Sequence, residues 1–230
     1  MTAFTKTRPV SALLFDLDDT LLDRRASVDH YLARHAERVG FSRGTASEYR
    51  ARFWELDGAG YVPRATVFEQ LVEQFPDCGI TTDLVADWKS HAFDTCVFIE
   101  GALEILEWSR GAGLRTAIIT NGRASFQRSK LERLSLVPAV DEVLVSGEEG
   151  IHKPEADLFR RAADRLGVAA SDCVYVGDNP HNDVLGAEAA GMQAIWFERD
   201  LPWPPDVPRP RHAIRDLRVL RDLVALASTE

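Results

Sequence analysis

The sequence contains few cysteines, no long apolar run and a shortage of positive charge. The three cysteines, Cys78, Cys96 and Cys173, are far apart and odd in number, so they imply no disulfide framework and favour a reducing compartment. Together with six histidines they form no spacing typical of a metal site. No apolar stretch approaches the length of a transmembrane helix, and we therefore expect no membrane partner.

Basic residues are outnumbered, with 27 Lys and Arg against 36 Asp and Glu and a net charge of -9. Nucleic-acid binding depends on neutralising phosphates with Lys and Arg, so we expect no nucleic-acid partner. The segment MTAFTKTRPV lacks the apolar part of a signal peptide, which predicts a cytoplasmic protein. The 230 residues, 45% of them hydrophobic, suffice for one large core or a core with a smaller insert. Both a monomer and a homodimer are compatible with this sequence.

The stretch from Leu13 to Leu22, LLFDLDDTLL, is the most informative part of the chain. Its apolar start predicts a buried strand over 12–18, and side chains two apart on a strand point the same way, so Asp16 and Asp18 should project together. Two carboxylates ~4 Å apart repel by about 4 kcal/mol at an effective dielectric of about 20. A cation or a shared proton resolves such a conflict. The ordinary alternative is a strand followed by an Asp-rich turn.

The pattern after this strand is helical and amphipathic to about residue 94, and it then alternates between helix and strand. Apolar strands alternating with helices indicate a parallel sheet covered on both faces. The sequence therefore predicts an α/β fold: a doubly wound, Rossmann-like parallel sheet core over 1–22 and 97–230, with an all-α domain inserted over 23–96. The predicted strands are 12–18, 115–120, 142–146, 173–177, 192–197 and 212–214, and the predicted helices are 26–39, 42–56, 64–75, 82–93, 102–110, 125–134, 155–166, 183–190 and 217–227.

Polar residues follow most of the predicted strands. In an open parallel sheet, ligands bind at the carboxyl ends of the strands. Each group has an ordinary explanation as a turn, a solvated lysine or a helix cap. All of them at strand ends, in this order, favour one small anionic site. The residues concerned are Asp16, Asp18, Thr120, Asn121, Gly122, Lys153, Asp178 and Asp183.

The segments DLDDT, TNG, KPE and GDNPHND resemble the four motifs of the haloacid dehalogenase (HAD) superfamily, in the order of that family. The resemblance covers the whole chain and implies a phosphatase-type hydrolase with a helical cap inserted after the first motif. It assigns Asp16 as the nucleophile that forms an aspartyl-phosphate. It assigns Asp18 as the general acid and then the general base. Haloalkanoate dehalogenases typically lack the second Asp, so Asp18 points to phosphate esters.

The resemblance also implies a phosphate site and a metal site. Lys153, the third catalytic residue, would neutralise the negative charge of the nucleophile and of the transferring group. Thr120, Asn121 and Gly122 would bind the substrate phosphate together with Lys153. Mg2+ is the expected cofactor because hard oxygen ligands suit it. Its ligands would be Asp16, Asp178, the main-chain carbonyl of Asp18 and also Asp183, either directly or through water.

The function predicted from these residues is a magnesium-dependent phosphatase that acts on a small phosphorylated metabolite. A phosphomutase shares all four motifs and is one alternative. A non-catalytic binding or regulatory protein that kept the fold is the other. The helical insert should act as a lid that excludes water. Its charged residues Arg24, Arg25 and Arg64 are expected mainly on the solvated surface, with a substrate contact as the alternative.

Overall fold

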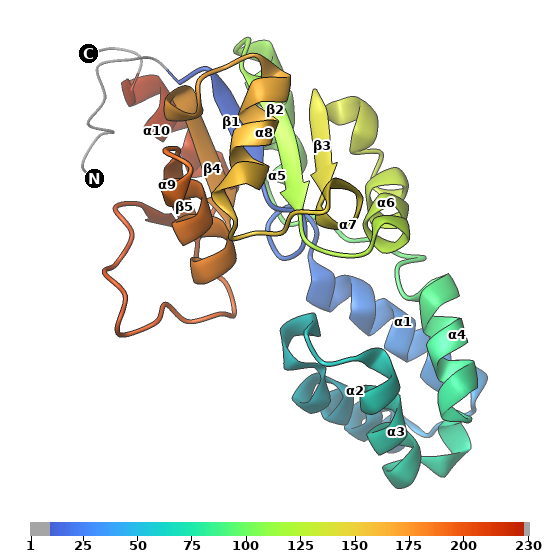
Figure 1. Ribbon diagram of the computed structural model, residues 1–230. Helices are drawn as coiled ribbons and strands as arrows, with labels where there is room; N and C mark the ends of the chain where they lie inside the picture. Colours follow the sequence, from blue (N-terminus) through green and yellow to red (C-terminus); the bar gives the residue numbers. More distant parts are fainter. Residues whose placement is uncertain (1–9, 228–230) are drawn as a thin grey trace. The chain divides into compact units, whose positions relative to one another are not determined.

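The computed structural model describes residues 10–227 and divides them into two compact units (Figure 1). The first, which we call the core unit, holds residues 10–23 and 97–227, and the second, the helical unit, is Arg24–Cys96. The two crossings between the units lie side by side, because Leu22 pairs with Phe98 and the Asp23 N–H donates to the Val97 carbonyl at 2.8 Å. Within the described residues, no helix combines the length and the hydropathy that crossing a bilayer would need.

The core unit is built on one parallel sheet in the order β3-β2-β1-β4-β5-β6. Chain order runs outward in one direction from β1 to β3 and in the other from β4 to β6, so the switch point lies between β1 and β4. The predicted doubly wound α/β fold is confirmed. The strands are β1 (Ala12–Phe15), β2 (Arg115–Thr120), β3 (Glu142–Val145), β4 (Cys173–Gly177), β5 (Gln193–Phe197) and β6 (Ala213–Ile214).

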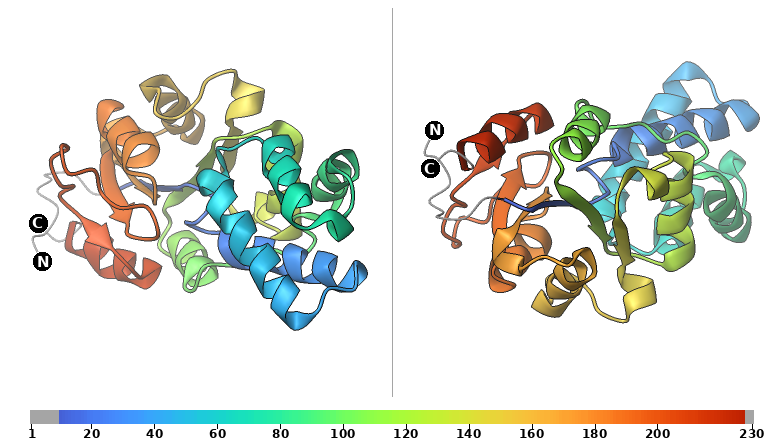
Figure 2. Two further views of the ribbon diagram at one scale, coloured as in Figure 1. Left: turned by 90° about the horizontal axis from the view of Figure 1, so that it is seen from below. Right: turned by 90° about the horizontal axis from the view of Figure 1, so that it is seen from above.

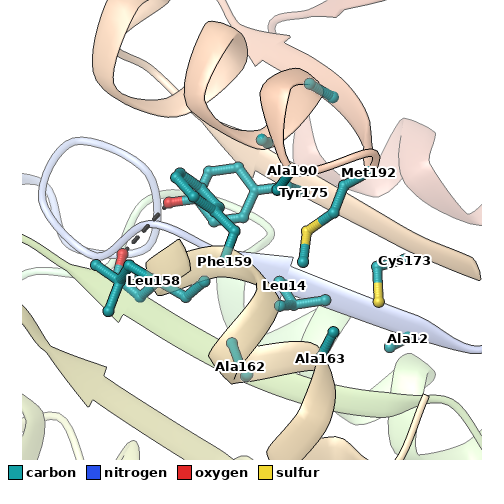
Figure 3. Packing of buried hydrophobic residues seen from close by; sticks show 14 of the residues in the cluster. Ala12, Leu14, Leu158, Phe159, Ala162, Ala163, Cys173, Tyr175, Ala190 and Met192 are labelled. Carbon is teal, nitrogen blue, oxygen red and sulfur yellow. Dashed lines mark hydrogen bonds between the residues drawn. The ribbon is translucent and has the colours of Figure 1, made fainter. Parts of the chain in front are cut away.

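Helices cover both faces of this sheet (Figure 2). On one face lie α8 (Ala156–Leu166) and α9 (Gly186–Ala189), and on the other lie α5 (Ala102–Gly111) and α10 (Leu220–Ala227). The strands are apolar on both sides because neither side meets water. Figure 3 shows the α8 side, where the Phe159 ring meets Tyr175 edge-on with centroids 4.9 Å apart. This packing brings the Tyr175 hydroxyl toward the carboxyl end of the sheet, where its oxygen lies 3.3 Å from the Ile119 carbonyl oxygen.

Three elements differ from the predicted ones. The first strand ends at Phe15 rather than at residue 18, because the chain turns at Asp19, whose φ of +59° is left-handed. A short helix, α7 (Ser146–Glu149), follows β3 where a loop was expected. The helix predicted over 183–190 is a π-helical turn, Pro180–Leu185, followed by α9. Each difference lies beyond the carboxyl end of a strand, namely β1, β3 and β4. A further helix of the core unit is α6 (Ala124–Arg133), which lies between β2 and β3 in the chain.

The helical unit consists of four helices around an aromatic core. They are α1 (Arg24–Arg38), α2 (Arg43–Asp57), α3 (Arg64–Gln74) and α4 (Thr81–His91). Phe53 of α2 stacks on Trp88 of α4 at 5.5 Å, and Phe68 of α3 meets the same indole at 6.0 Å. All three rings are buried, and aromatic pairs of this kind contribute to the stability of a core.

A buried ion triad ties three of these helices. The Asp57 carboxylate is 1% exposed and accepts from Arg24 at 2.8 Å and from Arg64 at 2.5 Å. The Arg64 guanidinium also lies over the Trp88 ring, 4.9 Å from its centroid. The expectation that Arg24 and Arg64 are solvated was therefore wrong: their side chains are only 12% and 15% exposed.

Asp57→Ala is expected to destabilise the helical unit by about 3–5 kcal/mol, because it leaves two guanidinium groups buried without their carboxylate. Burial alone would raise the pKa of Asp57, but Arg24 and Arg64 outweigh burial and hold that pKa below its ordinary value. The unfolded chain then takes up the proton first as the pH falls, so this contribution is complete above a pH of about 4 and is lost below it. Urea unfolding followed by tryptophan fluorescence measures both effects.

Glu55→Ala is the matched control, since Glu55 is 63% exposed and pairs only at the surface with Arg52. It should change stability by less than about 1 kcal/mol. Equal losses of stability from the two substitutions would contradict the contribution that we assign to the triad.

Candidate active site

The carboxyl ends of β1, β2 and β4 bring the motif residues together at one edge of the sheet. Asp16 follows β1, and its N–H donates to the Val176 carbonyl at 2.9 Å, which extends the ladder to β4 by one residue. Thr120 ends β2, and Asp178 follows β4. Because β2 and β4 are the two neighbours of β1, these side chains flank Asp16 on both sides.

Lys153 connects the acidic residues of this edge. Its ammonium contacts Asp16 Oδ1 at 2.5 Å, Asp183 Oδ1 at 2.6 Å and the Tyr175 hydroxyl at 3.1 Å. Burial by itself lowers the pKa of Lys153, but the carboxylates of Asp16 and Asp183 outweigh burial and raise that pKa well above its ordinary value. Lys153 is therefore a buried, permanently charged group within contact of Asp16.

Asn121 holds the backbone that carries Lys153. The Asn121 amide donates to the Lys153 carbonyl at 2.9 Å, and its oxygen accepts from the Lys153 N–H at 2.9 Å. This reciprocal pair joins the loop after β2 to the loop before α8. The side chain of Asn121 therefore acts on the position of Lys153.

Three buried carboxylates could hold a cation. Asp16, Asp178 and Asp183 each offer an oxygen, and these oxygens lie within 4.8 Å of one another. Burial, partly offset by Lys153, raises the pKa of Asp16 from 3.8 to about 7. Burial and the carboxylates of Asp16 and Asp183 raise the pKa of Asp178 to about 9. If all three were ionised, one lysine would leave two negative charges uncompensated, and a divalent cation with oxygen ligands fits this set.

Asp183 is the most constrained of the three. Its Oδ1 accepts from Lys153 and from the Tyr175 hydroxyl at 3.1 Å, and its Oδ2 accepts from the Asn179 N–H at 2.9 Å. A Cβ on Gly177 would lie 2.6 Å from Asp183 Oδ2, so only glycine at that position leaves room for the carboxylate. Asp183 thus orients Lys153 as well as belonging to the acidic cluster.

Asp18 lies outside the acidic cluster. Its carboxylate contacts the Lys130 ammonium at 2.7 and 2.8 Å and accepts from the Gln127 amide at 2.9 Å. The same Gln127 amide donates to the Thr120 hydroxyl at 2.5 Å. The strand predicted over 12–18 was too long, because β1 ends at Phe15, before both acids. The charge of Asp18 still acts on Asp16, whose pKa it helps burial to raise.

Sequence reasoning missed Gln127, Lys130 and Tyr175. Gln127 and Lys130 share one face of α6 with Leu131, a spacing that mixes polar side chains into the buried stripe of an amphipathic helix. That mixture was the available signal. Tyr175 carried no signal, because a tyrosine in an apolar strand is ordinary.

The main chain at Gly122 has a structural role. Its φ is +145°, and a Cβ there would lie 3.0 Å from Gln127 Cγ. Its N–H donates to Ser146 Oγ at 3.0 Å, at the start of α7. Glycine at this position therefore leaves room for Gln127, and its contact with phosphate stays a prediction.

A family model described as haloacid dehalogenase-like hydrolase matches residues 13–197, most of the chain and all the residues above. The chain belongs to the haloacid dehalogenase-like hydrolases. The family and the enzyme class expected from the four motifs are thereby confirmed.

Curated relatives of this hydrolase are named as phosphatases. A phosphoserine phosphatase of Thermus thermophilus is 33% identical over 239 residues, covering 90% of this chain and 94% of the relative. A ribulose-1,5-bisphosphate 5-phosphatase of Halopiger xanaduensis is 32% identical over 203 residues, covering 82% and 84%. These matches support the phosphatase type expected from the motifs.

Solved structures share the fold of this hydrolase. A HAD phosphatase of Thermococcus onnurineus has a TM-score of 0.61 at 26% identity and covers 93% of this chain and 97% of its own. The HAD-hydrolase YfnB of Bacillus subtilis has a TM-score of 0.73 at 24% identity, covering 94% and 99%. The α/β fold is therefore that of known members of the family.

Proposed function

We propose that this hydrolase is a magnesium-dependent phosphatase that cleaves a small phosphomonoester through an aspartyl-phosphate on Asp16. The observation that carries the proposal is the contact of the Lys153 ammonium with Asp16 inside a cluster of three buried carboxylates. An isolated ion pair would need no further acids, whereas a phosphoryl site needs a nucleophile, a cation site and a fixed positive charge.

In the first step a carboxylate oxygen of Asp16 attacks phosphorus, and the bond from phosphorus to the leaving oxygen breaks. Asp18 gives a proton to that oxygen, so the product leaves as an alcohol. Lys153 stays charged throughout and offsets the negative charge on the transferring group. Asn121 keeps the Lys153 backbone in place.

In the second step a water molecule gives a proton to Asp18 and attacks the phosphorus of the aspartyl-phosphate. The bond from phosphorus to Asp16 breaks, which releases inorganic phosphate and restores both carboxyl groups. The hydroxyl of Thr120, the main-chain N–H of Asn121 and Gly122 would bind the phosphate oxygens. Thr120 is held for this by Gln127.

Mg2+ would be held by Asp16, Asp178 and the main-chain carbonyl of Asp18. When bound, it supplies positive charge that neutralises the acidic cluster and the substrate phosphate. Asp183 would act on the site mainly by orienting Lys153, because both of its oxygens already accept hydrogen bonds from the protein.

The helical unit, Arg24–Cys96, would be the cap that the sequence places over residues 23–96, and it would exclude water during the reaction. The substrate class is a small phosphorylated metabolite, in keeping with relatives named for phosphoserine, glyceraldehyde 3-phosphate and phosphoglycolate. The residues assigned above would act on the phosphorus atom or the oxygens bonded to it. They therefore account for recognition of the phosphate group that all members of this class share.

The test is phosphate release, with and without Mg2+, from 4-nitrophenyl phosphate and a panel of alkyl phosphates. The panel holds phosphoserine, phosphoglycolate, glyceraldehyde 3-phosphate, hexose phosphates and nucleoside monophosphates. We expect Mg2+-dependent release that EDTA abolishes. Isomerised sugar phosphate with little free phosphate would establish the phosphomutase alternative, and Mg2+ binding without turnover would establish the non-catalytic one.

A further inference from the structure

The carboxylate of Asp18 is anchored by two side chains of α6. Lys130 Nζ lies 2.7 Å from Asp18 Oδ1 and 2.8 Å from Oδ2, and Gln127 Nε2 lies 2.9 Å from Oδ2. These residues are 112 and 109 positions away along the chain. Three short contacts to one carboxylate define both its plane and its rotamer.

The anchors are more buried than the group they hold. The Lys130 side chain is 6% exposed, whereas that of Asp18 is 24% exposed. Gln127 is 3% exposed. Asp18 is therefore the most solvent-exposed of these three side chains, and Lys130 and Gln127 are buried.

Gln127 joins this anchor to the phosphate site. Its amide group reaches Asp18 Oδ2 and the Thr120 hydroxyl at once. One side chain thus sets the separation of the expected proton donor from an expected phosphate ligand. The absence of a side chain at Gly122 leaves room for Gln127 in this position, since a Cβ there would lie 3.0 Å from Gln127 Cγ.

We propose that Lys130 and Gln127 are positioning residues for proton transfer by Asp18, an inference that rests on the proposed phosphatase function. Asp18 lies beyond the end of β1, in a turn whose backbone is held by bonds such as that from the Asp19 N–H to the Leu22 carbonyl at 2.7 Å. General acid catalysis requires the donor within hydrogen-bond reach of the leaving oxygen. A displacement of about 1 Å can cost about 10²-fold in rate. The backbone of this turn does not set the side-chain rotamer, and the two α6 side chains hold the carboxylate in one orientation.

The substrate series separates this role from a merely structural one. An alkyl alcohol needs a proton to leave, whereas 4-nitrophenolate leaves without one. We expect Lys130→Met to lower kcat/KM for the best alkyl phosphate of the panel by about 10- to 100-fold, a part of the factor that general acids supply. For 4-nitrophenyl phosphate kcat/KM should fall by less than about 3-fold, since kcat/KM covers the first step only and that step needs no acid there.

A double-mutant cycle identifies Asp18 as the group through which Lys130 acts. Adding Lys130→Met to Asp18→Asn should cause no further loss with the alkyl phosphate, because the positioned group is already gone. Lys130→Arg keeps the charge and offers two donors to the carboxylate, so it should recover most of the alkyl activity. Gln127→Met also removes the bond to Thr120, so it should lower kcat/KM for both substrates, and more for the alkyl phosphate.

Arg133→Met is the matched control, since it removes a positive charge from an exposed position of the same helix. It should leave both substrates unchanged. Equal loss on both substrates, no loss in a folded Lys130→Met, or full additivity with Asp18→Asn would each overturn the proposal. Absence of activity in the wild type with any phosphate ester would instead refute the proposed function.

Discussion

Asp16→Asn is expected to abolish phosphate release, with a loss of about 10⁴-fold or more in kcat, as for other nucleophile deletions. The amide has nearly the same size as the carboxyl but cannot attack phosphorus. The fold should survive, because the Lys153 ammonium keeps its 2.6 Å contact with Asp183. Phosphate release under saturating Mg2+ and far-UV circular dichroism measure activity and fold on the same sample.

Asp200→Asn is a suitable control, since it makes the same chemical change at an exposed position of the core unit. It should retain full activity. Turnover above about 1% of wild type by a folded Asp16→Asn protein would remove Asp16 from the nucleophile role, because an amide supplies no such reaction.

Asp178→Asn should change stability in opposite directions with and without Mg2+. In the metal-free protein Asp178 has a pKa of about 9, so its burial beside Asp16 and Asp183 disfavours the charged form. An amide removes this conflict, and the metal-free variant should be at least as stable as the wild type at pH 7. With Mg2+ the variant lacks a charged ligand and should bind the ion about 100-fold more weakly, or about 2.7 kcal/mol.

Thermal unfolding across a Mg2+ titration at pH 7 measures both parts of this prediction. The wild type should gain stability with the logarithm of the ion concentration, and Asp178→Asn should gain it only at much higher concentrations. Asp200→Asn again serves as the control and should follow the wild type. An unchanged Mg2+ response in Asp178→Asn would exclude Asp178 as a ligand.

Residues next to strand ends were predictable from the sequence. Asp16, Thr120 and Asp178 follow short apolar runs, and parallel strands place their carboxyl ends at one edge whatever the details of packing. Lys153 was predictable only as a member of an ordered set of motifs. Its contacts with Asp16 and Asp183 depend on the Asn121 side chain, which no periodicity reveals.

The direction of Asp18 was not predictable. The expected strand to residue 18 would have pointed it alongside Asp16, but β1 ends at Phe15 and the chain turns at Asp19. The side chain then meets α6, a helix more than a hundred residues later. Likewise, arginines such as Arg24 and Arg64 usually lie at the surface. Only the packing of three helices places Asp57 between them.

The sequence by itself determined the fold class, the order of the strands and helices, and which loops carry the motif residues. These follow from local patterns: apolar runs that must be buried and the polar residues that end them. Only the tertiary structure decided which charge pairs with which, namely Lys153 with Asp16 and Asp183, Lys130 with Asp18, and Asp57 with two arginines. The physical reason is that such pairs form between side chains far apart in the chain, over distances of a few ångströms that only the packed elements define.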